Sequence, residues 1–233
     1  LYSDRYPPDV DAARAAFAEA AAAGDLDARY NLGWLHCTLR DPPDLVAARA
    51  EFELAAAGGH TLAQRGLGHL LCEVWDPPDL PGARAAYQMA VDAGELDLLY
   101  DLAAVCALGG DAEAAGAAWE RVLEVEASGS GDAAVCLAEL AAVGGDVGRA
   151  MDLLEVAREH GVVEAPDYAA TLDPGTRDEA CRRLREDVDT TDALNFRGVA
   201  ALAAGDVGRA RLLWRLAADL EDVVAPLLLR AAD

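Results

Sequence analysis

Large apolar residues recur along this chain with the spacing of one helical face. An alanine is followed four positions later by a large residue and three positions after that by a small one. Because residues three and four apart lie on the same side of an α-helix, each triple defines a single apolar face. The triples are Ala13/Phe17/Ala20, Ala48/Phe52/Ala55, Ala83/Tyr87/Ala90, Ala115/Trp119/Val122, Ala150/Leu154/Ala157 and Ala210/Trp214/Ala217. They predict helices that each bury one face against a neighbour.

A second kind of helix is predicted between these triples, over 27–38, 62–73 and 97–107. It carries a leucine followed by a small residue: Leu32-Gly33, Leu67-Gly68, Leu102-Ala103 and Leu137-Ala138. An aspartate stands where each following helix should begin and can accept hydrogen bonds from its free amides (Asp44, Asp79, Asp111, Asp146, Asp206). A glycine follows several of the triple-bearing helices, where a left-handed residue is expected (Gly24, Gly59, Gly94, Gly161).

The helix pairs repeat at a fixed distance. Pro-Pro-Asp stands at 7–9, 42–44 and 77–79, which gives a period of 35 residues. After Asp79 the units shorten, because the distance from the small residue to the next alanine falls from 15 residues to 12. Proline suits a linker that ends one helix and starts another. Self-similarity at such a period indicates a solenoid, in which each unit buries its apolar face only against its neighbours.

The spacing divides the chain into four stretches. Residues 10–95 hold the 35-residue repeats and 96–161 the shorter ones, while 162–190 is a degenerate repeat of 30 residues, in which Pro166 and Pro174 predict a bend. Residues 191–233 hold the last repeat and a terminal helix over 222–231 that covers it. The helix at 10–23 lacks its partner helix, which is missing or reduced to 1–6, and the chain starts at Leu1, so we expect upstream residues to have been removed.

These features predict an all-α fold. We expect one right-handed α-solenoid of helix-turn-helix repeats over residues 1–233, with about thirteen or fourteen helices. The composition agrees, since 53% of residues are hydrophobic but only 6% are aromatic, and the apolar residues are mostly alanine and leucine. No apolar run of about 20 residues is present, so no membrane span is expected.

Composition also narrows the function classes. The sequence contains no lysine, which excludes Schiff-base, pyridoxal and P-loop chemistry. The formal net charge of −23 argues against nucleic-acid binding and would attract a basic partner. The carboxylates are interpreted first as a solubilising coat on outward helix faces. A regular stripe of carboxylates, as a nucleic-acid mimic would need, is not evident.

No metal, cofactor or catalytic site is predicted. The five cysteines (Cys37, Cys72, Cys106, Cys136, Cys181) include four at similar repeat positions and no C-x-x-C pair. Equivalent positions in stacked repeats do not converge on one ion, so we expect free, buried thiols and a reducing cytoplasmic location. His36, His69 and His160 are the only catalytic candidates, and no nucleophile, phosphate loop or metal motif accompanies them. A non-enzyme is therefore predicted.

The repeat pattern resembles a known family. Leu-Gly in the first helix, followed by alanine, an aromatic residue and alanine in the second, is similar to the tetratricopeptide repeat. The 15-residue spacing and the stretch at 21–33 are closer to its Sel1-like relative. The resemblance covers about residues 10–219 and departs from both forms. The proline that ends the second tetratricopeptide helix is absent, and Asp-Pro-Pro-Asp replaces the Gly-x-Gly turn of Sel1-like repeats.

The resemblance implies a role in binding a protein or peptide. In this family the first helices line a concave face, so eight residues are expected in or near one groove: Asp27, Tyr30, Trp34, Arg65, His69, Asp97, Tyr100 and Glu139. Rigid aromatics there would supply buried area and charges would fix orientation. Trp34 is the sharpest candidate, whereas Trp119 and Trp214 are expected in the core. The predicted function is a non-catalytic scaffold for a partner of basic and aromatic character.

Two alternatives stay open at this stage. The chain could be the regulatory or sensory arm of a larger protein whose effector or catalytic domain lies outside it. It could also assemble with itself through exposed repeat ends. Neither alternative changes the predicted fold.

Overall fold

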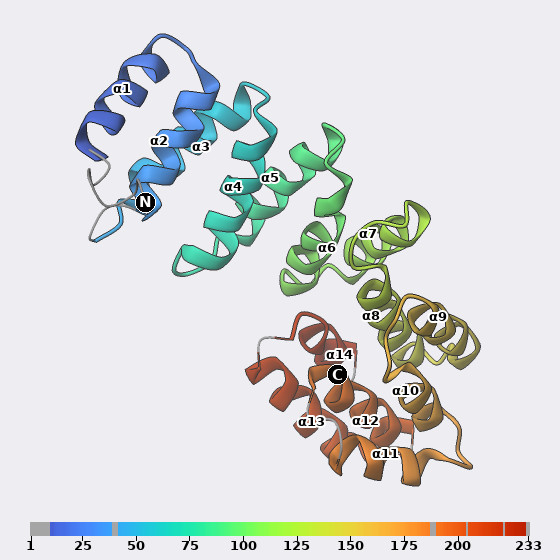
Figure 1. The fold of residues 1–233 in the computed structure, drawn as a ribbon. Helices are drawn as coiled ribbons and strands as arrows, with labels where there is room; N and C mark the ends of the chain where they lie inside the picture. The colour runs from blue at the N-terminus through green and yellow to red at the C-terminus, as the bar shows by residue number, and fades with distance from the viewer. Residues whose placement is uncertain (1–9, 39–41, 187–189, 204, 221, 232–233) are drawn as a thin grey trace, which may run out of the picture. The chain divides into compact units, whose positions relative to one another are not determined.

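The protein is helical throughout the parts that its computed structural model describes. These are residues 10–38, 42–186, 190–203, 205–220 and 222–231, and within them no strand occurs. Fourteen α-helices lie in these ranges (Figure 1). The predicted linker at 7–9 and the residues at 1–6 lie outside the described ranges. No helix in the described ranges has both the length and the apolar character needed to cross a bilayer.

The helices form two compact units, which divide between Leu98 and Leu99. Unit 1 contains α1 (Val10–Ala22), α2 (Leu26–Thr38), α3 (Leu45–Ala57), α4 (Thr61–His69), the π-helical turn η1 (Leu70–Val74), α5 (Leu80–Asp92) and the 3-10 turn η2 (Leu96–Leu98). Unit 2 contains α6 (Leu99–Leu108), α7 (Ala112–Glu124), α8 (Ser130–Val143), α9 (Val147–Glu159), α10 (Ala165–Leu172), α11 (Arg177–Glu186), α12 (Thr191–Ala203), α13 (Val207–Asp219) and α14 (Ala225–Ala231).

Within each unit, helices that are neighbours in sequence pack against each other. In unit 1, α2 packs on α3 and α4 on α5; in unit 2, α6 packs on α7, α8 on α9 and α12 on α13. This arrangement confirms the prediction of an all-α solenoid of helical pairs. The predicted boundaries between repeat types stay predictions.

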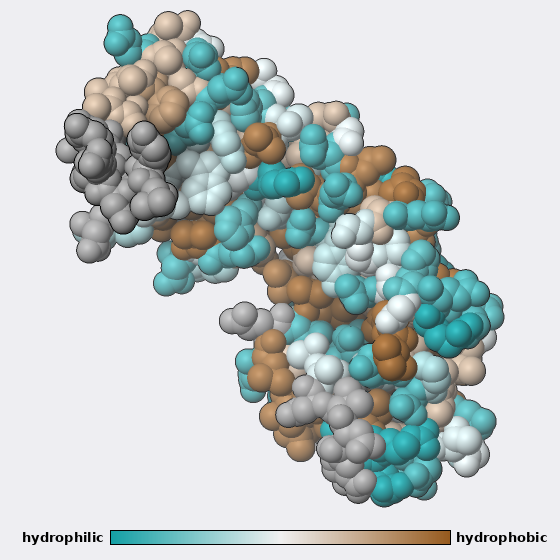
Figure 2. Space-filling model, in the orientation of Figure 1, coloured by the Kyte–Doolittle hydropathy of each residue, from teal (hydrophilic) through white to brown (hydrophobic). Residues whose placement is uncertain are grey.

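The recurring triples form the core of these pairs. The first alanine of each triple from Ala48 onward is fully buried, and so are Trp119 and Trp214, as predicted. Charged side chains gather at the surface instead. Over α11, where seven of ten residues are charged, the surface in Figure 2 is hydrophilic.

In three helix pairs, a glycine of the first helix makes room for the large residue of the second helix. A Cβ atom on Gly33 would lie 2.7 Å from the Phe52 ring, and one on Gly68 would lie 2.5 Å from the Tyr87 ring. At Gly198 the closest atom is Nε1 of Trp214, at 2.3 Å. The small residue of the first helix and the large residue of the triple in the second helix therefore form the two sides of one contact. The large side chain of one helix inserts where its partner has no Cβ.

The aspartate caps and the glycine turns predicted at the helix ends are also confirmed, whereas the helices predicted over 62–73, 97–107 and 222–231 occupy Thr61–His69, Leu99–Leu108 and Ala225–Ala231. Each of the five aspartates accepts a hydrogen bond from the backbone amide three residues later, at 3.0 Å (Asp44, Asp79, Asp111, Asp146, Asp206). The four glycines expected in left-handed turns all have positive φ, between 89° and 104°. Only glycine adopts this conformation without strain, so these turns are determined locally.

Replacing one of these capping residues should destabilise its helix. Asp146 is exposed, and its side chain accepts from the amide of Arg149. We expect Asp146→Ala to lower the free energy of unfolding of unit 2 by about 1 kcal/mol and Asp146→Asn to retain most of it, because Asn caps nearly as well. Urea unfolding followed by circular dichroism measures the difference. Equal stability of the two variants would contradict the capping role.

The terminal helix α14 packs on α13, and it also contacts α8 and α6. The Asp222 carboxylate caps its start by accepting from the amides of Val224 and Ala225, at 2.9 and 2.6 Å. Leu227 and Leu228 are buried. The sequence predicted that the terminal helix covers only the last repeat. In the structure it also covers parts of α6 and α8.

Candidate functional site

Unit 1 contains an apolar cleft of about 200 Å³ between α2, α3, α4 and the turn η1. We call it the Trp34 cleft. Its lining residues are Trp34, Cys37, Thr38, Phe52, Gly66, His69, Leu70 and Val74. Trp34 stands at its rim with 44% of its surface exposed, which is unusual for the largest apolar side chain. Trp34 and His69, both predicted as binding residues, thus meet in one cleft.

Tyr30 holds Trp34 in place. The indole Nε1 of Trp34 donates to the Tyr30 hydroxyl at 2.7 Å, one helical turn earlier. The Tyr30 ring stacks on His60, with centroids 5.1 Å apart, and lies tilted against Phe52 at 6.0 Å. A tryptophan fixed in this way loses little conformational entropy when a ligand covers it.

Asp27 acts on the same network through His60. The amide of Ala63 donates to His60 Nδ1 at 3.1 Å, so the ring proton is assigned to Nε2. Nε2 then donates to Asp27 Oδ1 at 2.8 Å. His60 was missed by sequence reasoning. Its place directly before Thr61, the first residue of α4, could have indicated a helix-capping side chain.

The remaining predicted residues of unit 1 place polar groups at the surface. His69 Nδ1 lies 3.1 Å from Glu73, and Arg65 lies 3.7 Å from Glu95. Asp97 is exposed in η2. Exposed ion pairs of this kind contribute little to stability, so their side chains can exchange partners at low cost.

Tyr100 and Glu139 belong to unit 2, and neither offers a free polar group there. Tyr100 is half-buried, and its hydroxyl is hydrogen-bonded with the Cys136 thiol, while burial raises the pKa of both groups. Glu139 is 0% exposed, so its predicted role as an accessible groove charge is wrong.

Glu139 is buried because α8 and α12 contact each other within unit 2. The Asn195 amide donates to Glu139 Oε2 at 3.3 Å and to Asp222 Oδ1 at 3.0 Å. Burial, followed by repulsion from Asp192 and Asp222, raises the pKa of Glu139 well above its usual value. Burial in the core of unit 2 therefore disfavours the charged form of this carboxyl group.

Three first turns in unit 2 surround a polar recess of about 500 Å³. Asp132 lies in the first turn of α8, Glu164 directly precedes α10 and Asp192 lies in the first turn of α12, with His160 and Tyr168 beside them. Burial, then repulsion from Asp222, Asp132 and Glu164, raises the pKa of Asp192 to about 7. Carboxylates at helix N-termini offset the positive end of the helix dipole, which compensates part of the cost of burying Asp192.

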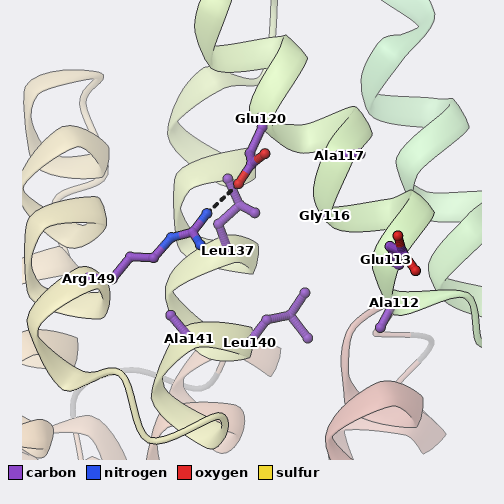
Figure 3. A pocket seen from close by; sticks show the side chains of 9 residues that line it. All are labelled: Ala112, Glu113, Gly116, Ala117, Glu120, Leu137, Leu140, Ala141 and Arg149. Atoms are coloured by element: carbon purple, nitrogen blue, oxygen red, sulfur yellow. Dashed lines mark hydrogen bonds and ion pairs between the residues drawn. The ribbon is translucent and has the colours of Figure 1, made fainter.

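A second recess of unit 2, about 380 Å³, lies between α7, α8 and α9 (Figure 3). Arg149 of α9 forms an ion pair with Glu120 of α7, with Leu137 of α8 beside it. Gly116 and Ala117 leave the α7 wall nearly flat. The recess lacks an aromatic anchor, which distinguishes it from the Trp34 cleft.

None of the three recesses described above is lined by more than one of the catalytic histidine candidates. His69 lines the Trp34 cleft, and His160 lines the polar recess of unit 2. His36 is not part of either lining. Within the described residues, no group of three histidines, cysteines or carboxylates could hold a metal ion.

Comparison with known proteins places the fold. No protein-family model matches the chain, and no curated protein matches it. One similar solved structure is a protective antigen present in uropathogenic Escherichia coli strains that displays an SLR (Sel1-like repeat) fold, with TM-score 0.51 and 17% identity. The match covers 93% of this chain, which spans only 50% of that one. Another is a tetratricopeptide repeat protein from Parabacteroides merdae, with TM-score 0.51, 16% identity and coverage of 96% and 92%.

Both matches confirm the resemblance at the level of the fold. The chain has the helical-repeat architecture shared by tetratricopeptide and Sel1-like repeats.

Proposed function

We propose that the protein is a non-catalytic scaffold that binds a peptide segment of a partner protein at the Trp34 cleft. The observation that supports this most is the exposed Trp34, held by Tyr30 at the rim of an apolar cleft. Interfaces gain most of their binding energy from a few such aromatic anchors. Repeat folds present such sites to extended or helical segments of other proteins.

The size of the cleft indicates which kind of chemical group it can bind. Its volume of about 200 Å³ lies below the ~300–1,000 Å³ of typical small-molecule pockets. It suits a single large side chain rather than a whole cofactor or metabolite. Phe52 and Leu70 form its apolar walls, so an aromatic or long aliphatic side chain of the partner should enter it.

Charge around the cleft favours basic flanking residues in the partner. Glu73 stands beside His69 at the rim, and the Asp27 side chain is 87% exposed. The chain as a whole has a formal net charge of −23, which would speed the association of a basic segment at low salt. We therefore propose an apolar anchor between arginine or lysine residues as the recognised motif.

Filling the cleft from inside tests the proposal. A Cβ atom on Gly66 would meet the Phe52 ring at 3.5 Å, an ordinary contact, so the rest of a larger side chain must enter the cleft. We expect Gly66→Leu to abolish peptide binding without loss of stability, because leucine favours a helix over glycine by about 0.8 kcal/mol. We expect Trp34→Ala to weaken binding by about 2 kcal/mol or more.

The probe is a phage-displayed library of random peptides selected on the wild-type protein. Selected sequences should share an aromatic or aliphatic residue with basic neighbours, and their affinities can be measured by fluorescence anisotropy. Leu54→Ala, on the exposed side of α3 and outside the cleft lining, serves as the surface control. Selected peptides that bind Gly66→Leu as tightly as the wild type would show that the cleft is not the binding site.

A further inference from the structure

The outward face of α13 carries a row of exposed leucines. Leu212, Leu216 and Leu220 are spaced four residues apart, the last directly after the final residue of α13, and are 57%, 44% and 60% exposed. The opposite face of the helix is fully buried, with Ala210, Trp214 and Ala217 at 0%. Figure 2 shows apolar side chains gathered over α13. Burial in the chain's own core therefore does not account for these leucines.

The repeat architecture does not require them either. The residue two positions after the buried alanine is Leu212 in α13, whereas the equivalent residues in the other helices are small or charged: Ala50, Ala85, Ala117 and Asp152. Leu216 has Leu54 as its equivalent in α3, but no second large apolar residue precedes Leu54 at the position of Leu212. The paired leucines are specific to this helix.

Charged side chains of both signs flank the leucines. Arg209, Arg215 and Asp219 are all exposed on α13. Among the described residues, none of the three takes part in an ion pair, although the chain has 42 carboxylate residues for 19 arginines. Exposed arginines on other helices, such as Arg149 and Arg158, do pair with a nearby glutamate.

We infer that this face of α13 pairs antiparallel with the same face of a second copy of the chain. In an antiparallel pair centred on residue 214, Leu212 meets Leu216 of the second copy at the same height along the helix. Arg209 then lies opposite Asp219, and Gly208 lies opposite Leu220, so a large side chain faces a small one. The spacing within the sequence alone sets these pairs.

The occupant is a second copy because the face is complementary to itself. An interface around a two-fold axis uses the same patch on both molecules, so every contact occurs twice. A different acidic or basic partner would satisfy only one sign of the charges on α13. One helix face buries little area, so the dimer should be weak and dependent on concentration, as expected of interfaces below about 1,200 Å². This inference does not depend on the Trp34 cleft.

Sedimentation velocity between about 1 μM and about 1 mM protein tests the pairing. We expect a reversible monomer–dimer equilibrium in the wild type. Leu212→Ser with Leu216→Ser should raise the dimer dissociation constant by about tenfold or more, since each lost contact counts twice. Leu54→Ser, at the position equivalent to Leu216 and with similar exposure, is the matched control and should leave the equilibrium unchanged.

A charge exchange separates pairing from non-specific stickiness of the leucines. Arg209→Asp and Asp219→Arg should each weaken the dimer, because like charges then face each other. The double variant should restore it. A wild type that stays monomeric over the whole range, a leucine double variant that still dimerises normally, or a charge exchange without recovery would each overturn the inference.

Discussion

Gly68→Ala is expected to destabilise unit 1, although alanine is the better helix former. The added Cβ would lie 2.5 Å from the ring of Tyr87, which is only 4% exposed and enclosed by the α4–α5 pair. Overpacking of this kind costs about 1–3 kcal/mol, and more where the neighbour cannot move. The gain in helix propensity returns only about 1 kcal/mol, so the clash dominates. Urea unfolding of the variant measures the loss.

Gly66 on the same helix provides the matched control. A Cβ atom there would be 3.5 Å from the nearest atom of Phe52, a normal contact distance. The same change, Gly66→Ala, should therefore raise the free energy of unfolding by up to about 1 kcal/mol. Because the gain in helix propensity is common to both variants, they should differ by the overpacking cost of about 1–3 kcal/mol. Equal effects at both positions would show that the fit of Gly68 against Tyr87 is not what selects glycine.

Asp192→Asn is expected to stabilise unit 2 at pH 8 and to remove part of its pH dependence. The pKa of Asp192 is raised from 3.8 to about 7, first by burial and then by Asp222, Asp132 and Glu164. Its position in the first turn of α12 favours the charged form, but such dipole effects reach only about 0.3–1 kcal/mol. The burial therefore dominates, and holding the charge in the folded state is unfavourable.

The direction of the pH effect follows from the raised pKa. Below pH 3.8 both states hold the proton, and Asp192 has no effect on stability. Between that value and about pH 7 the unfolded chain loses the proton while the folded chain keeps it, so stability falls by about 4 kcal/mol in total. Above about pH 7 the deficit is constant. The raised pKa of Glu139 acts in the same direction.

Hydrogen exchange of α8 and α12 at pH 5 and pH 8, corrected for the intrinsic exchange rate, measures this difference locally. We expect Asp192 to make wild-type unit 2 less stable at pH 8 than at pH 5 by about 3 kcal/mol, and Asp192→Asn to remove this contribution. Glu155→Gln is the control, because Glu155 is exposed and the Arg158 guanidinium lowers its pKa. A wild type whose stability is the same at both pH values would contradict the assignment.

Some features of the proposed binding face could be foreseen from the sequence and others could not. Trp34 and His69 were predicted from their place on the first helices, and both line the cleft. The supporting residues were not predicted. His60 lies 33 residues from Asp27 and meets it only because successive helix pairs stack. Gly66 gave no signal of its own, since a helix glycine can mark either a close contact or an open space.

Glu139 shows most clearly why a helical pattern was insufficient. Its position in the repeat places it on the inner face of α8. In an open array of repeats, residues on this face are accessible to solvent. In unit 2 the chain returns to α8, so that Asn195, 56 residues later, donates to Glu139. Small rotations between successive pairs accumulate into such a contact, and the period of the repeat does not encode their size.

The sequence by itself determined what depends on contacts within one helix or between adjacent ones. The repeat period, the five capping aspartates, the glycine turns and the fit of Gly33, Gly68 and Gly198 against large partners all arise from interactions of this short range. Only the tertiary structure decided which inner faces stay open. In unit 2, α14 packs over α6 and α8, whereas in unit 1 the Trp34 cleft stays exposed. This difference depends on the packing of helices that are far apart in sequence.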